Sequence, residues 1–268
     1  IGSSDNHNAT AVGDEDDFYG VSGLLDSDGQ KRGSLPLDST DNNSDVYFDR
    51  YARFGASGLA GVWAEENTRE SIYDAMRRKE TFGTSGPRLK IRFFAGHDLP
   101  LVDDDDLIAK SYSNGVSMGG NLIAEDTQPF AFIAWAAKDP NSAPLQRLQI
   151  VKGWVDAGQA HERVYDVACA DGLEVDSLTH RCPGNGATVD LTDCRVSSGV
   201  GAAEIKANWE DPEYDSTQHA FYYVRAIENP TCRWSTWDAV RAGISPREDI
   251  PATIQERGWS SPIWISPK

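Results

Sequence analysis

The sequence has no apolar run that approaches the roughly 20 residues a membrane-spanning helix needs, so we expect no membrane span. It also lacks the G-x-S-x-G turn of serine hydrolases, the G-x-G-x-x-G dinucleotide fingerprint and the phosphate-binding P-loop. Basic residues are few, 25 against 42 acidic ones, and the net charge is −17. Because such a chain repels phosphate backbones, nucleic acid is not an expected partner.

Cysteine is scarce, and all four cysteines lie in the second half of the chain, at Cys169, Cys182, Cys194 and Cys232. Their spacing is not the paired C-x-x-C of a zinc ribbon. An even number of cysteines in loop-like surroundings favours two disulfides, with free buried thiols as the alternative. Three pairings are possible, and we expect the nearest neighbours to pair, as Cys169–Cys182 and Cys194–Cys232. Disulfides indicate an oxidising compartment, so we expect a periplasmic or secreted protein.

Hydrophobic residues make up 39% of the chain, which is enough for a packed core. Residues 1–46 hold few of them and are expected to form loop. Aromatic spacing predicts a short helix over 47–57, and a second helix is expected to begin at Asn67 or Thr68 and to end by Gly83. Alternation then predicts strands separated by turn-rich loops, as in a β-sandwich. The expected strands are 58–64, 88–94, 130–136, 147–152, 163–169, 204–209 and 221–226.

The most informative residues for chemistry are the first ones, Ile1-Gly2-Ser3-Ser4-Asp5-Asn6-His7. In an extended segment, residues two positions apart project to the same side. The Asp5 carboxylate and the His7 imidazole could therefore reach one cation. This pair of donors suits Zn²⁺, Mn²⁺ or Fe²⁺ better than Ca²⁺. A surface turn with an exposed histidine is the alternative interpretation.

These residues also resemble a known motif. Ser4-Asp5-Asn6-His7 is similar to the last metal-ligand motif, S-D-x-H, of the PHP (polymerase and histidinol phosphatase) superfamily. Residues 58–88 resemble the closing strand–helix–strand of the branch that includes the carbaryl-hydrolase-like proteins. Over nearly its whole length the chain resembles the C-terminal half of a bacterial family of unknown function in that superfamily, and the segments 182–190, 228–238 and 251–264 carry this similarity.

The resemblance implies an α+β fold in two domains. Residues 1–95 would form the final strand and helix elements of a distorted β/α barrel of the PHP type. Residues 96–268 would form a mainly antiparallel β-sandwich-like accessory domain with two disulfides. The start at Ile1-Gly2, without Met, predicts a fragment, a processed product or a trimmed chain.

The resemblance also implies a function. An N-terminal half of the same protein would supply the other metal ligands, and the chain would be an incomplete part of a metal-dependent hydrolase. Its substrate would be a small anionic phosphoester or a related ester, and Asp5 and His7 would bind the divalent metal. Asn6 stands where the family has a smaller residue.

Two further hypotheses stay open. Ser85 and Arg88 could place a hydroxyl and a guanidinium near an anionic substrate, although a turn with a structural arginine also explains them. The competing function is a non-enzymatic extracellular binding module that recognises glycan or protein. Four C-terminal tryptophans could form a sugar-stacking platform, but we expect them to pack in the core: Trp234, Trp237, Trp259 and Trp264.

Overall fold

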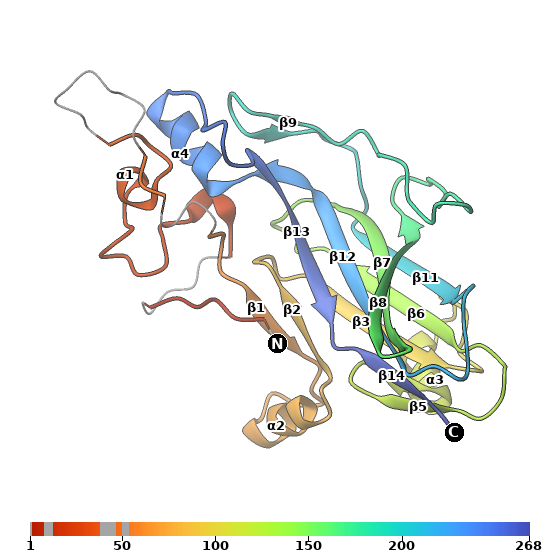
Figure 1. The fold of residues 1–268 in the computed structure, drawn as a ribbon. Coiled ribbons are helices and arrows are strands. Elements are labelled where there is room, and N and C mark those ends of the chain that lie inside the picture. The colour runs from red at the N-terminus through yellow and green to blue at the C-terminus, as the bar shows by residue number, and fades with distance from the viewer. Residues whose placement is uncertain (1, 8–12, 38–46, 50–53) are drawn as a thin grey trace.

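The computed structural model describes residues 2–7, 13–37, 47–49 and 54–268. The regular structure of this part of the chain consists mainly of β-strands that run next to one another in two sheets, with a few short helices at their edges (Figure 1). A small two-stranded ribbon of β9 (Val189–Asp190) and β10 (Arg195–Val196) lies apart from both sheets.

The larger sheet has eight strands, and its central strand is the long β12. One edge of β12 pairs with β7, which continues into β8, and the other edge pairs with β13 and then β14. Beyond β13 come β2 and β1, and beyond β14 comes β5, the one parallel neighbour. The strands are β1 (Leu59–Val62), β2 (Thr81–Thr84), β5 (Asn121–Ala124), β7 (Leu145–Asp156), β8 (Gln159–Cys169), β12 (Ala220–Cys232), β13 (Thr253–Ser260) and β14 (Ile263–Pro267).

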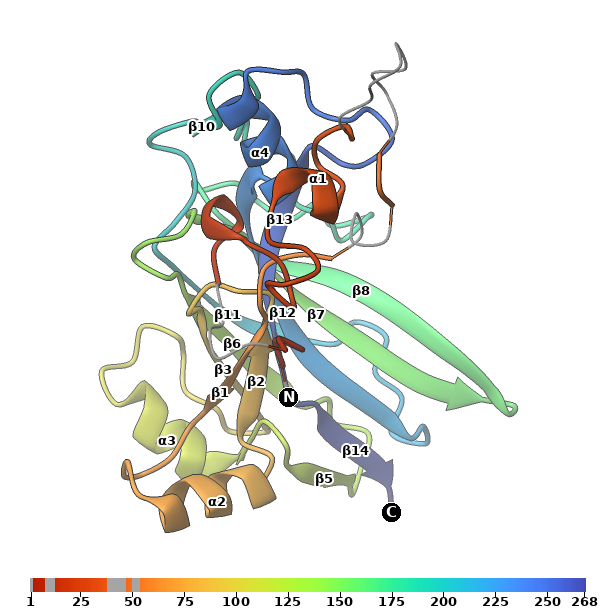
Figure 2. The ribbon, with the colours of Figure 1, turned by 90° about the vertical axis from the view of Figure 1, so that its left-hand side faces the viewer.

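The smaller sheet has four antiparallel strands in the order β11-β6-β3-β4. They are β3 (Lys90–Gly96), β4 (Val116–Ser117), β6 (Ala131–Ala137) and β11 (Glu204–Glu210). Its inner face packs against the larger sheet around one hydrophobic core, in which Phe132 of β6 meets Tyr222 of β12 with ring centroids 4.7 Å apart. The β7–β8 hairpin extends beyond this core and turns at Ala157-Gly158, where both residues have positive φ (Figure 2).

The helices lie at the margins of the sheets. α3 (Leu107–Asn114) covers the outer face of the smaller sheet, where Leu107 packs on Phe94 and Ile133. α2 (Arg69–Arg77) joins β1 to β2, and its first turn is capped by Thr68, whose Oγ1 accepts a hydrogen bond from Ser71 N at 3.3 Å. α2 ends before Gly83, which belongs to β2.

α4 (Trp234–Ala242) follows β12 and ends at Gly243, which takes the left-handed conformation that suits glycine. The N-terminal segment 13–37 packs against this helix and contains the short η1 (Glu15–Asp17) and α1 (Gly29–Arg32). Its main anchor is a buried two-pronged ion pair in which Arg32 donates to Asp238 at 2.8 and 2.7 Å. Glu15 adds a second anchor, because its carboxylate accepts from Trp234 N at 2.7 Å.

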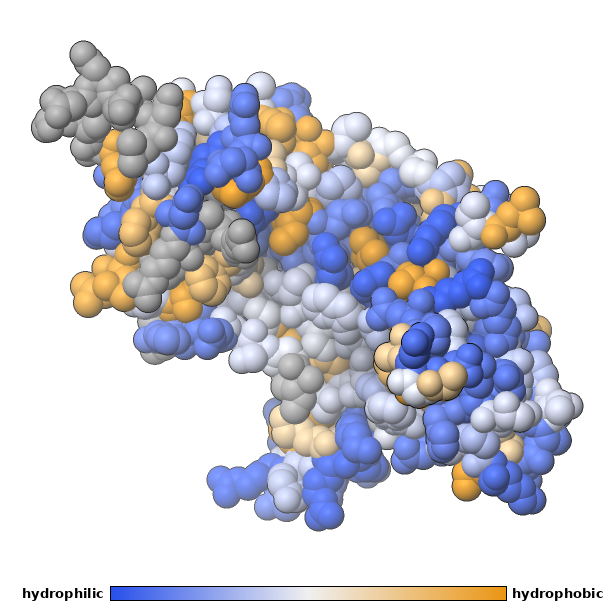
Figure 3. Space-filling view, in the orientation of Figure 1, coloured by the Kyte–Doolittle hydropathy of each residue, from blue (hydrophilic) through white to orange (hydrophobic). Residues whose placement is uncertain are grey.

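Apolar side chains remain exposed on this N-terminal part, as Figure 3 shows at the left of the molecule. They are Leu24, Leu25, Leu37, Phe48 and Phe54. The C-terminal tryptophans divide: Trp234 is buried as expected, whereas Trp264 is 45% exposed and packs on Phe221.

Both expected disulfides are confirmed, as Cys169–Cys182 and Cys194–Cys232. They are compatible with an extracellular location. Among the described residues, no helix has the length and the apolar composition needed to cross a membrane.

The expectation of PHP-type barrel elements is wrong. A β/α barrel needs parallel neighbours joined by helices, but β1 and β2, the strands on either side of α2, pair antiparallel. β2 then continues into the larger sheet through β13, and β3 enters the smaller sheet through β6. The strand–helix–strand of residues 58–88 is therefore part of an antiparallel sheet system, and no barrel closes among the described strands. The proposed division at residues 95 and 96 stays a prediction.

The helix expected over 47–57 is not formed at either of its described ends, 47–49 and 54–57, and residues 50–53 lie outside the description. Tyr47 contacts the C-terminal part of the chain: its ring lies under the Arg247 guanidinium, 4.5 Å from the ring centroid.

Candidate functional site

The Asp5–His7 motif lies on a segment whose backbone runs very close to the β1 end of the larger sheet. A Cβ atom on Gly2 would lie 2.0 Å from the Leu59 carbonyl oxygen, and one on Gly58 would lie 2.8 Å from that of Ser3. Only glycine allows this approach at both points. At the other end of the motif, His7 N donates to Val21 O at 2.9 Å. The motif is thus held from both sides by backbone contacts.

The structure brings the two side chains of the motif together. His7 Nε2 lies 3.8 Å from Asp5 Oδ1, and the side chains are 68% and 85% exposed. The backbone that achieves this is not the extended segment expected, because Asp5 has φ 52°, in the left-handed region. Such a conformation costs energy for a residue other than glycine and is often found at functional sites.

The donor pair fits a metal chemically, since a carboxylate oxygen and an imidazole nitrogen are common ligands of Zn²⁺ and related cations. Two ligands are not a complete site. Among the residues that the structure describes, no group of three or more His, Cys, Asp or Glu side chains could hold a metal ion.

Ser85 and Arg88, the expected substrate contacts, have separate structural partners. The Ser85 hydroxyl donates to Glu256 and accepts from Arg257 N at 2.8 Å. Arg88 N donates to Asp139 Oδ2 at 2.7 Å, while the Arg88 side chain is exposed. The Ser85 hydroxyl is therefore already used within the protein, whereas the Arg88 guanidinium faces solvent.

Two buried carboxyl groups lie near these residues, and no sequence motif indicated them. Glu228 accepts from Ser142 Oγ at 2.5 Å, and Glu256 accepts from Ser85; the Oε1 atom of each has no hydrogen-bond partner. Burial raises the pKa of Glu228 to about 8 and that of Glu256 to about 7. Both groups are therefore protonated over much of the range in which ordinary carboxyls are charged.

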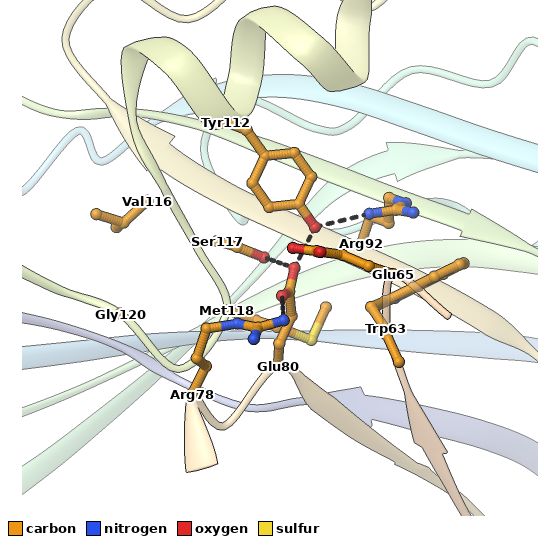
Figure 4. Close-up of a pocket in the computed structure, with 11 residues that line it drawn as sticks. Trp63, Glu65, Arg78, Glu80, Arg92, Tyr112, Val116, Ser117, Met118 and Gly120 are labelled. Carbon is orange, nitrogen blue, oxygen red and sulfur yellow. Dashed lines mark hydrogen bonds and ion pairs between the residues drawn. The ribbon is translucent and has the colours of Figure 1, made fainter. Parts of the chain in front are cut away.

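A separate pocket of about 680 Å³ opens between the end of β1, the end of α2, β3, α3 and β4 (Figure 4). The polar side chains that line this pocket are far apart in the sequence, so no sequence motif indicates the pocket. They are Glu65, Arg78, Glu80, Arg92, Tyr112 and Ser117, and Trp63 adds an aromatic wall.

The buried Glu80 carboxylate organises this pocket. It accepts hydrogen bonds from Tyr112 Oη and from Ser117 Oγ at 2.9 Å, and it pairs with Arg78 Nη2 at 3.4 Å. Tyr112 Oη in turn accepts from Arg92 Nη1 at 3.1 Å. Burial, followed by the bond to Glu80, raises the pKa of Tyr112 above its ordinary value, so the phenol keeps its proton and its place in the chain of bonds.

Arg92 is fixed by a second contact. Its guanidinium lies over the Trp63 ring, 3.7 Å from the ring centroid, and Trp63 Nε1 donates to Ile91 O at 2.7 Å. Arg78 is the C-cap residue of α2, and no motif in the sequence connects it with Arg92. These residues meet because strand pairing brings β3, β4 and the end of α2 together, and this pairing cannot be seen in the sequence.

The family model described as "Protein of unknown function (DUF3604)" matches residues 1–267. No curated protein and no solved structure matches the chain.

Proposed function

Since the chain belongs to the DUF3604 family of proteins of unknown function, we propose from its geometry that it supplies two ligands, Asp5 and His7, to the divalent-metal centre of a hydrolase. The observation that carries this proposal is the 3.8 Å separation of Asp5 Oδ1 and His7 Nε2 on exposed side chains. Ligand atoms lie about 2.0–2.2 Å from Zn²⁺, so two ligands of one ion are at most about 4 Å apart. The pair fits within that limit.

The two residues have distinct roles in this proposal. The Asp5 carboxylate brings negative charge to the ion, and the neutral His7 imidazole binds through Nε2, the atom that faces Asp5. The remaining ligands come from polypeptide outside the described residues. The bound metal would activate water and stabilise the negative charge that develops on the oxygen atoms of the ester.

The similarity of Ser4-Asp5-Asn6-His7 to the S-D-x-H motif supports a relationship of this family to the PHP superfamily and thus a phosphoester or a related small anionic ester as substrate. That similarity concerns the ligand motif and not the barrel, which the described strands do not form. We place the protein in the periplasm or outside the cell, and the two disulfides support this.

The test uses protein purified from its source, with whatever polypeptide accompanies residues 1–268. Bound zinc, manganese and iron are measured by mass spectrometry, and hydrolysis of a nitrophenyl phosphate ester is followed in parallel. We expect Asp5→Ala and His7→Ala each to lower metal affinity by at least about tenfold, because each removes a direct ligand. Asp103→Ala, in an exposed acidic loop, is the matched control.

Two results would count against the proposal. One is source protein that holds no transition metal. The other is a double Asp5→Ala, His7→Ala variant whose metal content and hydrolysis equal those of the parent.

The second candidate is a non-enzymatic extracellular module that binds glycan or protein. The observation that favours it is the pocket around Glu80, which is assembled from five elements and shares no residue with the Asp5–His7 motif. Ligand binding without any metal-dependent hydrolysis in the same preparation would support this candidate over the first.

A further inference from the structure

The pocket around Glu80 differs in charge from the protein as a whole. The chain carries a net charge of −17, yet two guanidinium groups, those of Arg78 and Arg92, line this one pocket. Two carboxylates, Glu65 and Glu80, also line the pocket, so its formal charges balance while the rest of the chain is strongly acidic. The Glu80 carboxylate is buried and bonded to Tyr112, Ser117 and Arg78.

Both guanidinium groups keep N–H donors for a ligand. Arg78 uses Nη2 toward Glu80, and Arg92 uses Nη1 toward Tyr112. Within the part of the chain that the structure describes, their other guanidinium nitrogens have no hydrogen-bond partner. Each group is nevertheless held in place, Arg78 by the buried carboxylate and Arg92 by Tyr112 and the Trp63 ring. Donors fixed in advance lose little conformational freedom when a ligand binds.

The aromatic wall does not offer a stacking platform. One face of Trp63 is covered by Arg92 at 3.7 Å, and the ring also packs against Phe82, with centroids 6.0 Å apart. Recognition by ring stacking, as many sugar sites use, is therefore disfavoured here. The free features of the pocket are charged N–H donors and, at Glu65, an exposed carboxylate that can only accept hydrogen bonds.

We propose that this pocket binds a small hydroxylated organic anion, whose carboxylate or phosphate group is held by Arg78 and Arg92 and whose hydroxyl groups donate to Glu65. Guanidinium groups match the planar edge of such oxyanions. The volume of about 680 Å³ fits a ligand of monosaccharide to disaccharide size. Glu65 selects against simple polyanions that carry no hydroxyl donor. This site is independent of the metal ligands proposed above.

Isothermal titration calorimetry at low ionic strength tests the proposal with four probes: inorganic phosphate, glucuronate, glucose 6-phosphate and glucose. We expect glucuronate or glucose 6-phosphate to bind at least about tenfold more tightly than glucose, since only they can form charge-assisted bonds with the arginines. Which of the two binds better identifies a carboxylate or a phosphate as the anionic group.

Three variants locate the binding. Arg92→Met keeps an apolar stem over Trp63 and should weaken binding by about tenfold, whereas Arg78→Met, at a half-exposed side chain, should weaken it by about threefold. Glu65→Gln removes a repelling charge and should tighten inorganic phosphate binding by about twofold to fivefold. Arg195→Met, at an exposed residue of β10 outside the pocket, is the matched control and should bind like the parent.

The proposal is overturned if no anion binds more tightly than glucose. It is equally overturned if the Arg78 and Arg92 variants bind like the parent. Because Arg92 also contacts Trp63, the ligand binding of Arg92→Met is compared with that of the parent under conditions in which both proteins are fully folded. Glu65 is exposed and has no such contact, so its variant tests the electrostatic argument even if Arg92→Met fails to fold.

Discussion

Glu228 makes the stability of this protein depend on pH in the direction opposite to that of most carboxyl groups. Its side chain is fully buried, its Oε1 atom has no partner, and its pKa is raised to about 8. In the unfolded chain an ordinary glutamate loses its proton near pH 4.3. Between these two values the folded protein holds a proton that the unfolded chain has released. Raising the pH therefore favours unfolding.

The size of the effect follows from this difference. One proton released on unfolding lowers the free energy of unfolding by about 1.4 kcal/mol for each pH unit, or by about 4 kcal/mol between pH 5 and pH 8. Glu256, with a pKa of about 7, adds to the slope below that pH. The contribution of Glu228 is fully present below about pH 4 and is lost as the pH rises to about 8.

Glu228→Gln tests this reasoning, because the amide is neutral at every pH and can still accept from Ser142. In urea denaturation at four pH values from 5 to 8, with the disulfides intact, we expect the variant to lose about 1.4 kcal/mol per pH unit of the parent's slope. It should be close to the parent at pH 5 and more stable at pH 8. Glu162→Gln, at an exposed residue of β8, should keep the parent's slope. Parallel curves for parent and Glu228→Gln would refute the account.

Two further predictions concern the attachments of the N-terminal segment and the loops. Arg32→Met leaves the buried Asp238 without its ion-pair partner and should lower the free energy of unfolding by about 3–5 kcal/mol. Limited proteolysis should then cut the variant within residues 13–37 before the sheets unfold. Equal protease resistance of variant and parent would contradict this. Replacing the Cys194–Cys232 pair by serines should lower the free energy of unfolding by about 4 kcal/mol, and replacing Cys169–Cys182 should lower it by about 3 kcal/mol, because the first bond closes 38 residues and the second 13. If denaturant unfolding shows the larger loss for Cys169–Cys182, the loop-entropy argument is contradicted.

Local signals in the sequence predicted local structure well. Thr68, one of the two start residues expected, caps the first turn of α2. The disulfide pairing also followed from proximity along the chain, since Cys169 ends β8 and Cys182 lies in the loop after it.

The sheet partners could not be read in this way. β2 pairs with β13 and β3 pairs with β6, across long stretches of sequence, and alternation of apolar residues is the same whichever strand lies alongside. The resemblance of residues 58–88 to a barrel element predicted the parallel strand neighbours of a β/α barrel, and the antiparallel pairing of β1 and β2 contradicts this prediction. The residues of the pocket around Glu80 come together only through this strand pairing, so the sequence could not identify them as one site.

Glu228 and Glu256 show the same limit for buried charge. Glu256 lies in a stretch of β13 where burial alternates, Glu228 lies in a continuous buried run of β12, and nothing in the sequence distinguishes either from an exposed glutamate. A β-bulge between Ile227 and Pro230 shifts the register of β12 against β13 next to Glu228. Bulges redirect side chains near functional sites, and they arise from pairing rather than from local composition.

The antiparallel sheets matter to the proposed metal ligands because they fix the segment that carries them. Gly2 and Gly58 let that segment lie against β1, and His7 N is bonded to Val21, just ahead of the part that Arg32 ties to α4. The position of Asp5 and His7 is therefore set by backbone contacts with Gly58, Leu59 and Val21. Through this contact with β1, a mainly structural sheet region would contribute to a metal centre without supplying a ligand.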